Sequence, residues 1–276
     1  MSAVTPSVKL PRLAVTGRLA FHRVLLSEWT KLRSVRSTKW SLFAGFLLTI
    51  AFPIIFSFVT RSHWGSMSAS DRAGRHPLDI ALAGVNVAQL AVAVLGVLLI
   101  SAEYSTGSIR STFTAVPKRL PVLWAKLLDY AVVVLVLIVP AVLISFFASQ
   151  AILSSISQLH MSFSQPGVAR AVLGGAVYVM LVGIFALAIG AIVRNTAGGI
   201  ATFAAIFFVL PPLMFTLPTS WNNAISQYLP SNAGRQLFAL QHASHTLTTW
   251  TGGLVFVGYC AAAIVIAAIL LVRRDV

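Results

Sequence analysis

The chain has 276 residues, of which 58% are hydrophobic and 9% are charged, and its formal net charge is +14. Soluble domains carry about 25% charged residues, so this composition excludes an ordinary soluble domain and predicts a protein embedded in lipid. The positive charge could suggest nucleic acid. The basic residues flank apolar segments, however, so we expect membrane lipid as the partner and no nucleic acid.

The first 39 residues divide into two parts. Residues 1–17 contain two prolines and a glycine, and we expect a disordered N-terminal tail. Residues 18–39 are predicted to form an interfacial connecting helix, because apolar side chains recur on one helical face and basic side chains occupy much of the rest. The apolar face consists of Phe21, Leu25, Trp29 and Leu32. The alternative is a solvated positive flank that only orients the first span.

Six apolar stretches follow. A hydrocarbon core about 30 Å thick requires roughly 20 apolar residues per helix, and six stretches meet this requirement: 40–60, 80–101, 127–149, 171–193, 199–217 and 251–272. Backbone groups in lipid must satisfy their own hydrogen bonds, which predicts helices. We therefore expect an all-α integral membrane protein whose six-span transmembrane domain covers residues 40–276.

The distribution of Lys and Arg predicts the orientation of the spans. Of the 20 basic residues, fifteen lie on the side that holds both ends of the chain and residues 102–126, and five lie on the other side. Cytoplasmic segments carry an excess of Lys and Arg. Both termini are therefore predicted to be cytoplasmic.

The inner loop at residues 102–126 is too polar to span a membrane. We expect a short helix from Glu103 to Phe113 that lies across the membrane surface and is ended by Pro117 and Pro121. Asp129 is expected just inside the start of the third span, where a negative charge suits a helix N-terminus.

Two further features concern the spans and the outer side. Asn86 and Gln89 share one face of the second span. They either make hydrogen bonds to other helices or face a cavity, and both interpretations stay open. The outer loop at residues 218–250 is rich in apolar side chains, and we expect a re-entrant pair of short helices that buries them in the outer leaflet.

Motifs for catalysis are absent from the sequence. It contains no G-x-x-x-x-G-K-[ST] phosphate loop, no H-E-x-x-H and no G-x-S-x-G. His242 and His245 lack a nearby third metal ligand, which favours a solvated loop over a metal site. The spans carry no ionisable residue at mid-membrane of the kind that a proton-coupled carrier uses. We expect no enzyme activity, cofactor or metal in this chain, and any energy for transport should come from another chain.

Three segments together resemble the type-2 ABC exporter permease family in its six-span bacterial form. Residues 27–42 (SEWTKLRSVRSTKWSL) resemble the connecting helix of that family. Residues 101–119 resemble its E-x-x-x-G-[ST] loop, with Glu103, Gly107 and Ser108 at the motif positions. Residues 229–234 (LPSNAG) resemble the last outer loop, where the family carries short re-entrant helices.

The resemblance implies a permease subunit in the bacterial cytoplasmic membrane. A separate ABC ATPase subunit would bind ATP and Mg²⁺, and a second permease copy or a related permease would pair with this chain. The residues implied to couple to the ATPase are Glu103, Tyr104, Thr106, Gly107, Arg110, Glu28, Lys31 and Arg33. The residues implied to line the translocation path are Asn86, Gln89, Phe203, Phe207 and Met214, for which helix packing is an equal alternative.

A path with few charges and several aromatic side chains fits an amphipathic or apolar cargo. Three other functions stay open on the sequence alone. The chain could anchor or regulate a partner without moving a substrate, it could be an ion channel or secondary carrier, or, least favoured, it could be a membrane-embedded enzyme. An adjacent gene for an ATPase with a phosphate loop would favour the exporter.

Overall fold

The computed structural model describes residues 21–108, 119–241 and 243–274. These residues form helices and connecting segments, with no strand among them. Six helical stretches are long and apolar enough to cross a membrane, which confirms the predicted all-helical fold with six candidate spans. They are Arg36–Ser66, Pro77–Ser105, Arg119–Leu153, Val168–Val193, Thr196–Thr216 and Thr249–Arg273.

The helices follow one another in a simple order along the chain. The α-helices are α1 (Phe21–Ser34), α2 (Arg36–His63), α3 (Ala69–Ala73), α4 (Pro77–Ala81), α5 (Ala83–Ser105), α7 (Arg119–Leu153), α8 (Val168–Val193), α9 (Thr196–Ala204), α10 (Leu210–Leu213), α11 (Thr219–Ile225), α12 (Pro230–Arg235) and α13 (Thr249–Arg273). Short 3₁₀ turns occupy Trp64–Ser66, Ser157–Leu159, Met214–Thr216 and Ser226–Tyr228, and a π-helical segment occupies Ala205–Val209.

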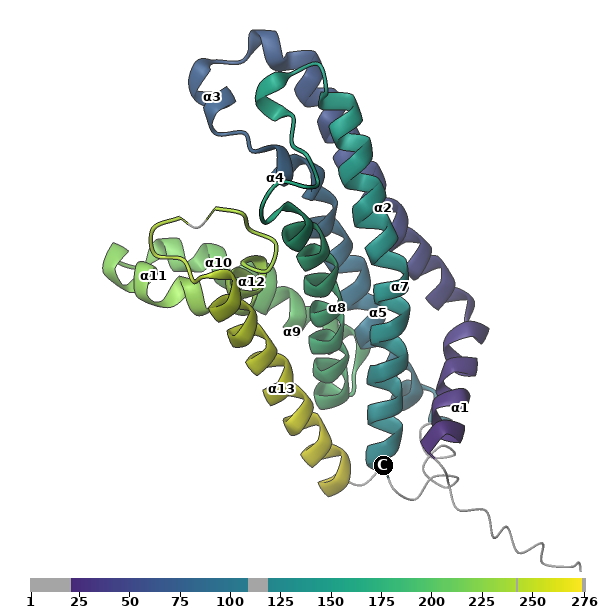
Figure 1. The fold of residues 1–276 in the computed structure, drawn as a ribbon. Coiled ribbons are helices and arrows are strands. Elements are labelled where there is room, and N and C mark those ends of the chain that lie inside the picture. Colours follow the sequence, from purple (N-terminus) through teal and green to yellow (C-terminus); the bar gives the residue numbers. More distant parts are fainter. Residues whose placement is uncertain (1–20, 109–118, 242, 275–276) are drawn as a thin grey trace, which may run out of the picture.

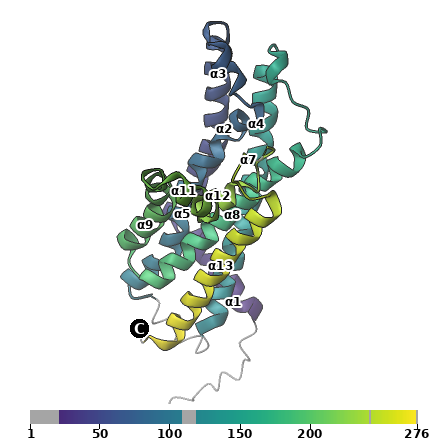
Figure 2. The same cartoon turned by 90° about the vertical axis from the view of Figure 1, so that its left-hand side faces the viewer.

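The long helices form a bundle with α5 and α8 at its centre (Figure 1). In the most apolar window of each span, 56% of the second span and 67% of the fourth is buried, against 17% of the fifth. The helices α2 and α7 run in the same direction and extend beyond the ends of α5 and α8 (Figures 1 and 2). The start of α7 and the end of α13 lie at the same end of the bundle as α1, which we call the α1 end.

Small residues allow the central helices to approach closely. A Cβ atom added to Gly84 of α5 would lie 2.3 Å from the backbone carbonyl oxygen of Thr49 in α2. A Cβ atom on Gly96 of α5 would lie 2.6 Å from the carbonyl oxygen of Gly183 in α8. Side chains at these positions would force the helices apart, as expected for membrane bundles in which small residues line the contacts.

The buried face of α2 is made of small and polar residues: Thr38, Gly45, Thr49, Pro53, Ser57 and Thr60. Its large apolar side chains point away from the bundle, and they include Phe43, Leu47, Phe52, Ile55 and Phe58. This polarity is the reverse of that of a soluble amphipathic helix. It fits a helix whose outer surface meets lipid, because lipid solvates apolar side chains and close packing then favours small ones.

The structure differs from the sequence predictions at three places near the α1 end. The predicted connecting helix at 18–39 is interrupted at Val35, which has extended backbone angles, so α1 and α2 are separate helices. Residues 103–105 continue α5, and residues 109–118 lie outside the described part. The helix α7 begins at Arg119 and includes Pro121 in its first turn, where a missing N–H costs little. Asp129 is therefore well inside α7 and not at its N-terminus.

The fifth span changes its helical form before two prolines. The π-helical segment Ala205–Val209 follows α9, and Pro211 and Pro212 lie in α10. Proline has no N–H and its ring collides with the carbonyl group four residues earlier. A local π-turn relieves this conflict in membrane helices, which explains the widened turn just before the two prolines.

The outer loop contains the expected short helices, α11 and α12. Only part of the expected burial occurs within this chain, because Leu229 is buried whereas Trp221, Tyr228 and Trp250 are exposed. Arg170 at the start of α8 binds the segment that follows α12. Its guanidinium donates hydrogen bonds to the carbonyl oxygens of Leu237 and Ala239 at 3.2 Å and 2.8 Å.

Candidate functional site

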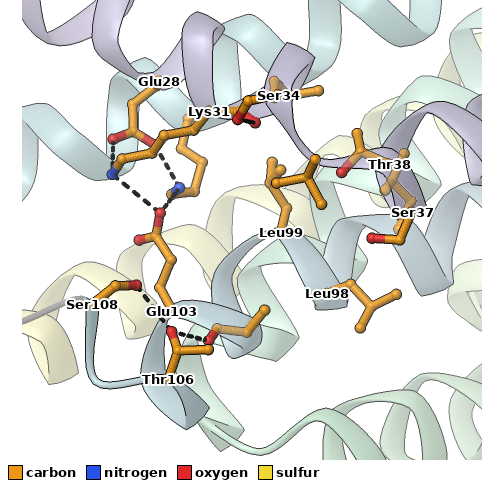
Figure 3. Close-up of a pocket in the computed structure, with 15 residues that line it drawn as sticks. Glu28, Lys31, Ser34, Ser37, Thr38, Leu98, Leu99, Glu103, Thr106 and Ser108 are labelled. Carbon is orange, nitrogen blue, oxygen red and sulfur yellow. Dashed lines mark hydrogen bonds and ion pairs between the residues drawn. The ribbon is translucent and has the colours of Figure 1, made fainter.

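Four charged side chains from three helices meet at the α1 end (Figure 3). Glu28 and Lys31 come from α1, Glu103 from the last turn of α5, and Lys126 from the second turn of α7. The Nζ of Lys126 lies 2.5 Å from one carboxylate oxygen of Glu28 and 3.0 Å from Oε1 of Glu103. The Nζ of Lys31 lies 2.7 Å from the other oxygen of Glu28 and 3.1 Å from the same Oε1. We call these four residues the inner ion-pair cluster.

Most of the inner ion-pair cluster is removed from water. The side chains of Glu28 and Lys126 are 2% and 3% exposed, and that of Glu103 is 13% exposed, whereas that of Lys31 is 39% exposed. Burying charges is costly unless each meets an opposite charge. Each of the four does so here, which makes α1 depend on both α5 and α7 for its charge balance.

The ion pairs shift the ionisation of the two residues on α1. Burial by itself would raise the pKa of Glu28, but the ammonium groups of Lys126 and Lys31 outweigh burial and hold that pKa below its ordinary value. Burial would lower the pKa of Lys31, but its contacts with Glu28 and Glu103 outweigh burial and raise it. Both groups are therefore held in their charged forms while α1 is packed on the bundle.

Apolar contacts support the same docking of α1. Val24 of α1 packs with Val122 and Ala125 of α7, and all three side chains are buried. The buried face of α1 consists of Val24, Glu28 and Leu32. Of the four side chains predicted to form its apolar face, Leu32 is buried and Phe21 is exposed. The inner face of α1 thus follows the ion pairs and not the apolar stripe alone.

A cavity of about 450 Å³ adjoins the inner ion-pair cluster. Leu32, Leu95, Leu98 and Leu99 supply apolar lining, and Ser34, Ser37, Thr38 and Thr106 supply hydroxyl groups. Figure 3 shows Glu103 directed toward Lys31, with Leu98 and Leu99 further along the cavity. The cavity separates the junction of α1 and α2 from the end of α5.

A third carboxylate, Asp129, lies one helical turn after Lys126 on α7. Asp129 is 4% exposed, and its Oδ2 atom has no hydrogen-bond partner among the described residues. The adjacent Tyr130 is fully buried, and its hydroxyl donates a hydrogen bond to the carbonyl oxygen of Val92 at 2.5 Å. Asp129 is therefore enclosed by the bundle, without an ion pair to any residue that the structure describes.

The other residues predicted to couple to an ATPase lie around this cluster. The ring of Tyr104 packs under the guanidinium of Arg194, which is 4.9 Å from the ring centroid. Thr106 is exposed, and Gly107 adopts a left-handed backbone with φ of 72°. Arg33 is exposed and lies over the ring of Trp29. Arg110 lies outside the described residues.

Glu28 and Lys31 have a different setting from the one expected of partner contacts. The carboxylate of Glu28 is buried and turned toward Lys126, so it contributes to the interior of the chain and not to its surface. Lys31 is partly exposed and bridges Glu28 and Glu103. Exposed positions close to the inner ion-pair cluster include Arg33, Thr106, Gly107 and Ser108.

The residues predicted to line a path lie mainly inside this chain. Gln89 is buried and accepts a hydrogen bond at 2.6 Å from the hydroxyl of Tyr178 in α8, which is the helix-packing alternative. Phe203 and Phe207 are buried and stack with a centroid separation of 4.5 Å. Asn86 and Met214 are half-buried. Of the five, none is fully exposed on the surface of the described chain.

Sequence reasoning missed two members of the site. Lys126 was assigned to a loop, and Asp129 to a helix end. The signal was present, because a basic and an acidic residue three positions apart within an apolar stretch share one helical face and must find partners in lipid. The partners of Lys126 on α1 and α5 are distant in sequence, and only the fold brings them together.

The site offers no metal centre in the part of the chain described: no group of three or more His, Cys, Asp or Glu side chains is close enough to hold an ion. His245 lies in the exposed outer loop, and His242 lies outside the described residues. No known protein family and no curated protein matches this chain.

Proposed function

We propose that this chain is the permease subunit of an ATP-driven ABC exporter, with the α1 end in the cytoplasm of a bacterial cell. Six helices that can cross a membrane support the membrane assignment. The excess of Lys and Arg at the segments near α1, α7 and the end of α13 supports the orientation. The three segments that resemble the type-2 exporter permeases support the subunit type.

The observation that carries the proposal is the inner ion-pair cluster. It joins the helix that resembles the connecting helix to the end of α5 that carries the E-x-x-x-G-S motif. The motif residue Glu103 is itself the link, because its Oε1 atom contacts both Lys31 and Lys126. A force applied to the segment after Glu103 therefore reaches α1 and α7 together.

The mechanism follows from this linkage. ATP binding would draw two ATPase subunits together and move the exposed residues Thr106, Gly107 and Ser108 at the end of α5. The ion pairs would pass that movement to α1 and α7, and the two permease copies would rock to open the path outward. Such a switch requires that the ATPase contact this segment differently in its two states. The exposed face of the fifth span, with Phe208, Val209 and Leu213, would be available to line a path between two copies.

A site-specific crosslink tests the subunit assignment. A photoreactive residue placed at Thr106 in the full chain, expressed in its native host, should capture an ATPase that carries a phosphate loop. The same residue at Thr216, exposed near the opposite end of the spans, should not capture it. Capture at Thr216 and not at Thr106 would refute the orientation, and absence of an ATPase at both positions would refute the subunit assignment.

A matched pair of glycine variants tests the coupling. Gly107→Val forces a β-branched residue into a left-handed backbone, whereas Gly258→Val adds a side chain where nothing lies within 4 Å. We expect the first variant to lose substrate-stimulated ATP turnover in the purified complex and the second to retain it. Equal turnover in both variants would contradict a coupling role for the segment after Glu103.

A further inference from the structure

The cavity beside the inner ion-pair cluster follows one face of α5. At 1.5 Å per residue, its lining residues Leu95 and Thr106 are about 16 Å apart along the helix. One leaflet supplies half of a hydrocarbon core that is about 30 Å thick, so the cavity runs from the end of a span to about the depth of one leaflet's acyl chains. The α5 residues in this lining recur every three or four positions: Leu95, Leu98, Leu99, Ala102, Glu103 and Thr106.

The two sides of the cavity differ in chemistry. Leu95, Leu98 and Leu99 of α5 form an apolar wall, whereas the junction of α1 and α2 contributes the exposed residues Ser34 and Ser37. Figure 3 shows Leu98 and Leu99 across the cavity from this junction. The volume of about 450 Å³ lies in the range of ligand pockets, which is about 300–1,000 Å³. A ligand with a polar head and an apolar chain matches these two sides.

The surface at the junction of α1 and α2 is basic. Arg33, Arg36 and Lys39 are exposed, and no acidic residue occurs in the sequence between Glu28 and Asp71. Basic residues at a membrane surface attract anionic lipid headgroups, each by about fivefold. The charge of this surface therefore favours a ligand whose head is negative.

An exposed tryptophan places the same junction at the level of lipid headgroups. Trp40 follows Arg36 by about one turn of α2 and is 70% exposed. Tryptophan side chains concentrate at the boundary between headgroups and hydrocarbon. The polar side of the cavity is thus expected at the depth of lipid phosphates, and its leucine wall at the depth of acyl chains.

We propose that this cavity binds one acyl chain of an anionic phospholipid from the leaflet at the α1 end, with the lipid phosphate at the junction of α1 and α2. The chain covers Leu95, Leu98 and Leu99. The phosphate lies beside Ser37, which Arg36 and Lys39 flank in the first turn of α2. This inference goes beyond the proposed exporter function, since it concerns the isolated chain and requires no ATPase.

Photolabelling in lipid nanodiscs tests the site on the native chain. The nanodiscs contain phosphatidylcholine and a small amount of phosphatidylglycerol with a photoreactive group in its acyl chain, and mass spectrometry locates the label. Leu98 and Leu99 should be labelled, and unlabelled phosphatidylglycerol should compete. Photoreactive phosphatidylcholine should label them at least about fivefold less. At Val265, which is 55% exposed on α13, the two probes should label equally, because bulk lipid contacts that surface.

A cavity-filling variant tests where the chain lies. Ala102→Trp places a large side chain in the cavity and should abolish the label at Leu98 and Leu99. Ala262→Trp, at an exposed position of α13, is the matched control and should leave that label unchanged. Equal labelling in the two variants would overturn the proposal.

A pair of charge variants tests the headgroup. Arg36→Gln combined with Lys39→Gln should remove the preference for phosphatidylglycerol at the leucine wall. Arg273→Gln combined with Arg274→Gln removes the same charge from exposed positions at the same end and should retain the preference. An equal loss in both double variants would show attraction to the whole surface and would overturn the site.

The native chain alone can also refute the proposal. Equal labelling of the leucine wall by the two lipids would contradict an anionic ligand. Label at Val265 without label at Leu98 and Leu99 from either probe would show that lipid does not enter the cavity.

Discussion

Lys126 is the residue whose removal should most disturb the α1 end. Its side chain is 3% exposed and contacts both Glu28 and Glu103. Lys126→Met keeps most of the side-chain length and removes the charge. Two carboxylates then share the partly exposed Lys31 alone, and Glu28 stays buried without its shorter ion pair.

The magnitude follows from the charge that is left behind. Removing one partner of a buried pair costs about 3–5 kcal/mol. Protonation of Glu28 sets an upper limit, because its ordinary pKa is 4.5 and each pH unit corresponds to about 1.36 kcal/mol. At about pH 7 the gap of about 2.5 units gives about 3.4 kcal/mol, or about 300-fold in the docking equilibrium.

Hydrogen exchange of the backbone amides in α1 measures this loss. Exchange in Lys126→Met should accelerate by up to about 300-fold, limited by the free energy of docking in the native chain. Lowering the pH should restore protection, since protonated Glu28 tolerates burial. Lys31→Met is the matched control, and because Lys31 is partly exposed its loss should cost about 1 kcal/mol or less. If Lys126→Met accelerates exchange no more than Lys31→Met, the assigned role of Lys126 is wrong.

Three further predictions concern the bundle and its pH dependence. Gly84→Ala should lower the free energy of unfolding by about 1–3 kcal/mol because its Cβ would meet a backbone carbonyl of α2. Gly258→Ala, in open space, should not lower it. Equal melting temperatures for the two variants would contradict the close packing of α5 on α2. Gln89→Leu removes the acceptor of the hydrogen bond that the hydroxyl of buried Tyr178 donates and should cost about 0.6–1.7 kcal/mol. In a background of Tyr178→Phe the same change should cost less. The lowered pKa of Glu28 stabilises the docking of α1 at pH values above the ordinary pKa of 4.5. The protection of the α1 amides from hydrogen exchange should therefore be lost as the pH falls below that value. Protection that persists in strong acid would contradict a stabilising role for the ion pairs.

Much of the fold could be predicted because lipid imposes a simple rule on sequence. A stretch of about 20 apolar residues must become a helix, and all six predicted stretches did. The ends were less predictable. Arg119 and Pro121 looked like loop residues, yet the first turn of a helix tolerates both, so α7 begins earlier than its apolar stretch.

The candidate site was less accessible to sequence reasoning. The motif around Glu103 and the basic helix around Lys31 could be singled out separately, but nothing local indicated that one carboxylate would bridge two lysines. The buried role of Lys126 could not be recognised from the sequence, because basic residues beside a span are ordinary membrane anchors. Gln89 illustrates a different limit, since an amide on a membrane helix can face a path or a neighbouring helix, and nothing in the local sequence indicates the hydroxyl of Tyr178 as its partner.

The inverted polarity of α2 has a consequence for reading variation in this chain. Exchanges among bulky apolar residues at Phe43, Leu47 or Phe58 should pass unnoticed, since acyl chains accommodate any of them. A larger side chain at Thr49 or Ser57, both of which are buried against the bundle, would instead displace a whole span. A hydropathy scale would rate the harmful replacements as improvements. The tolerance of this helix to substitution should therefore depend on side-chain size and not on hydrophobicity.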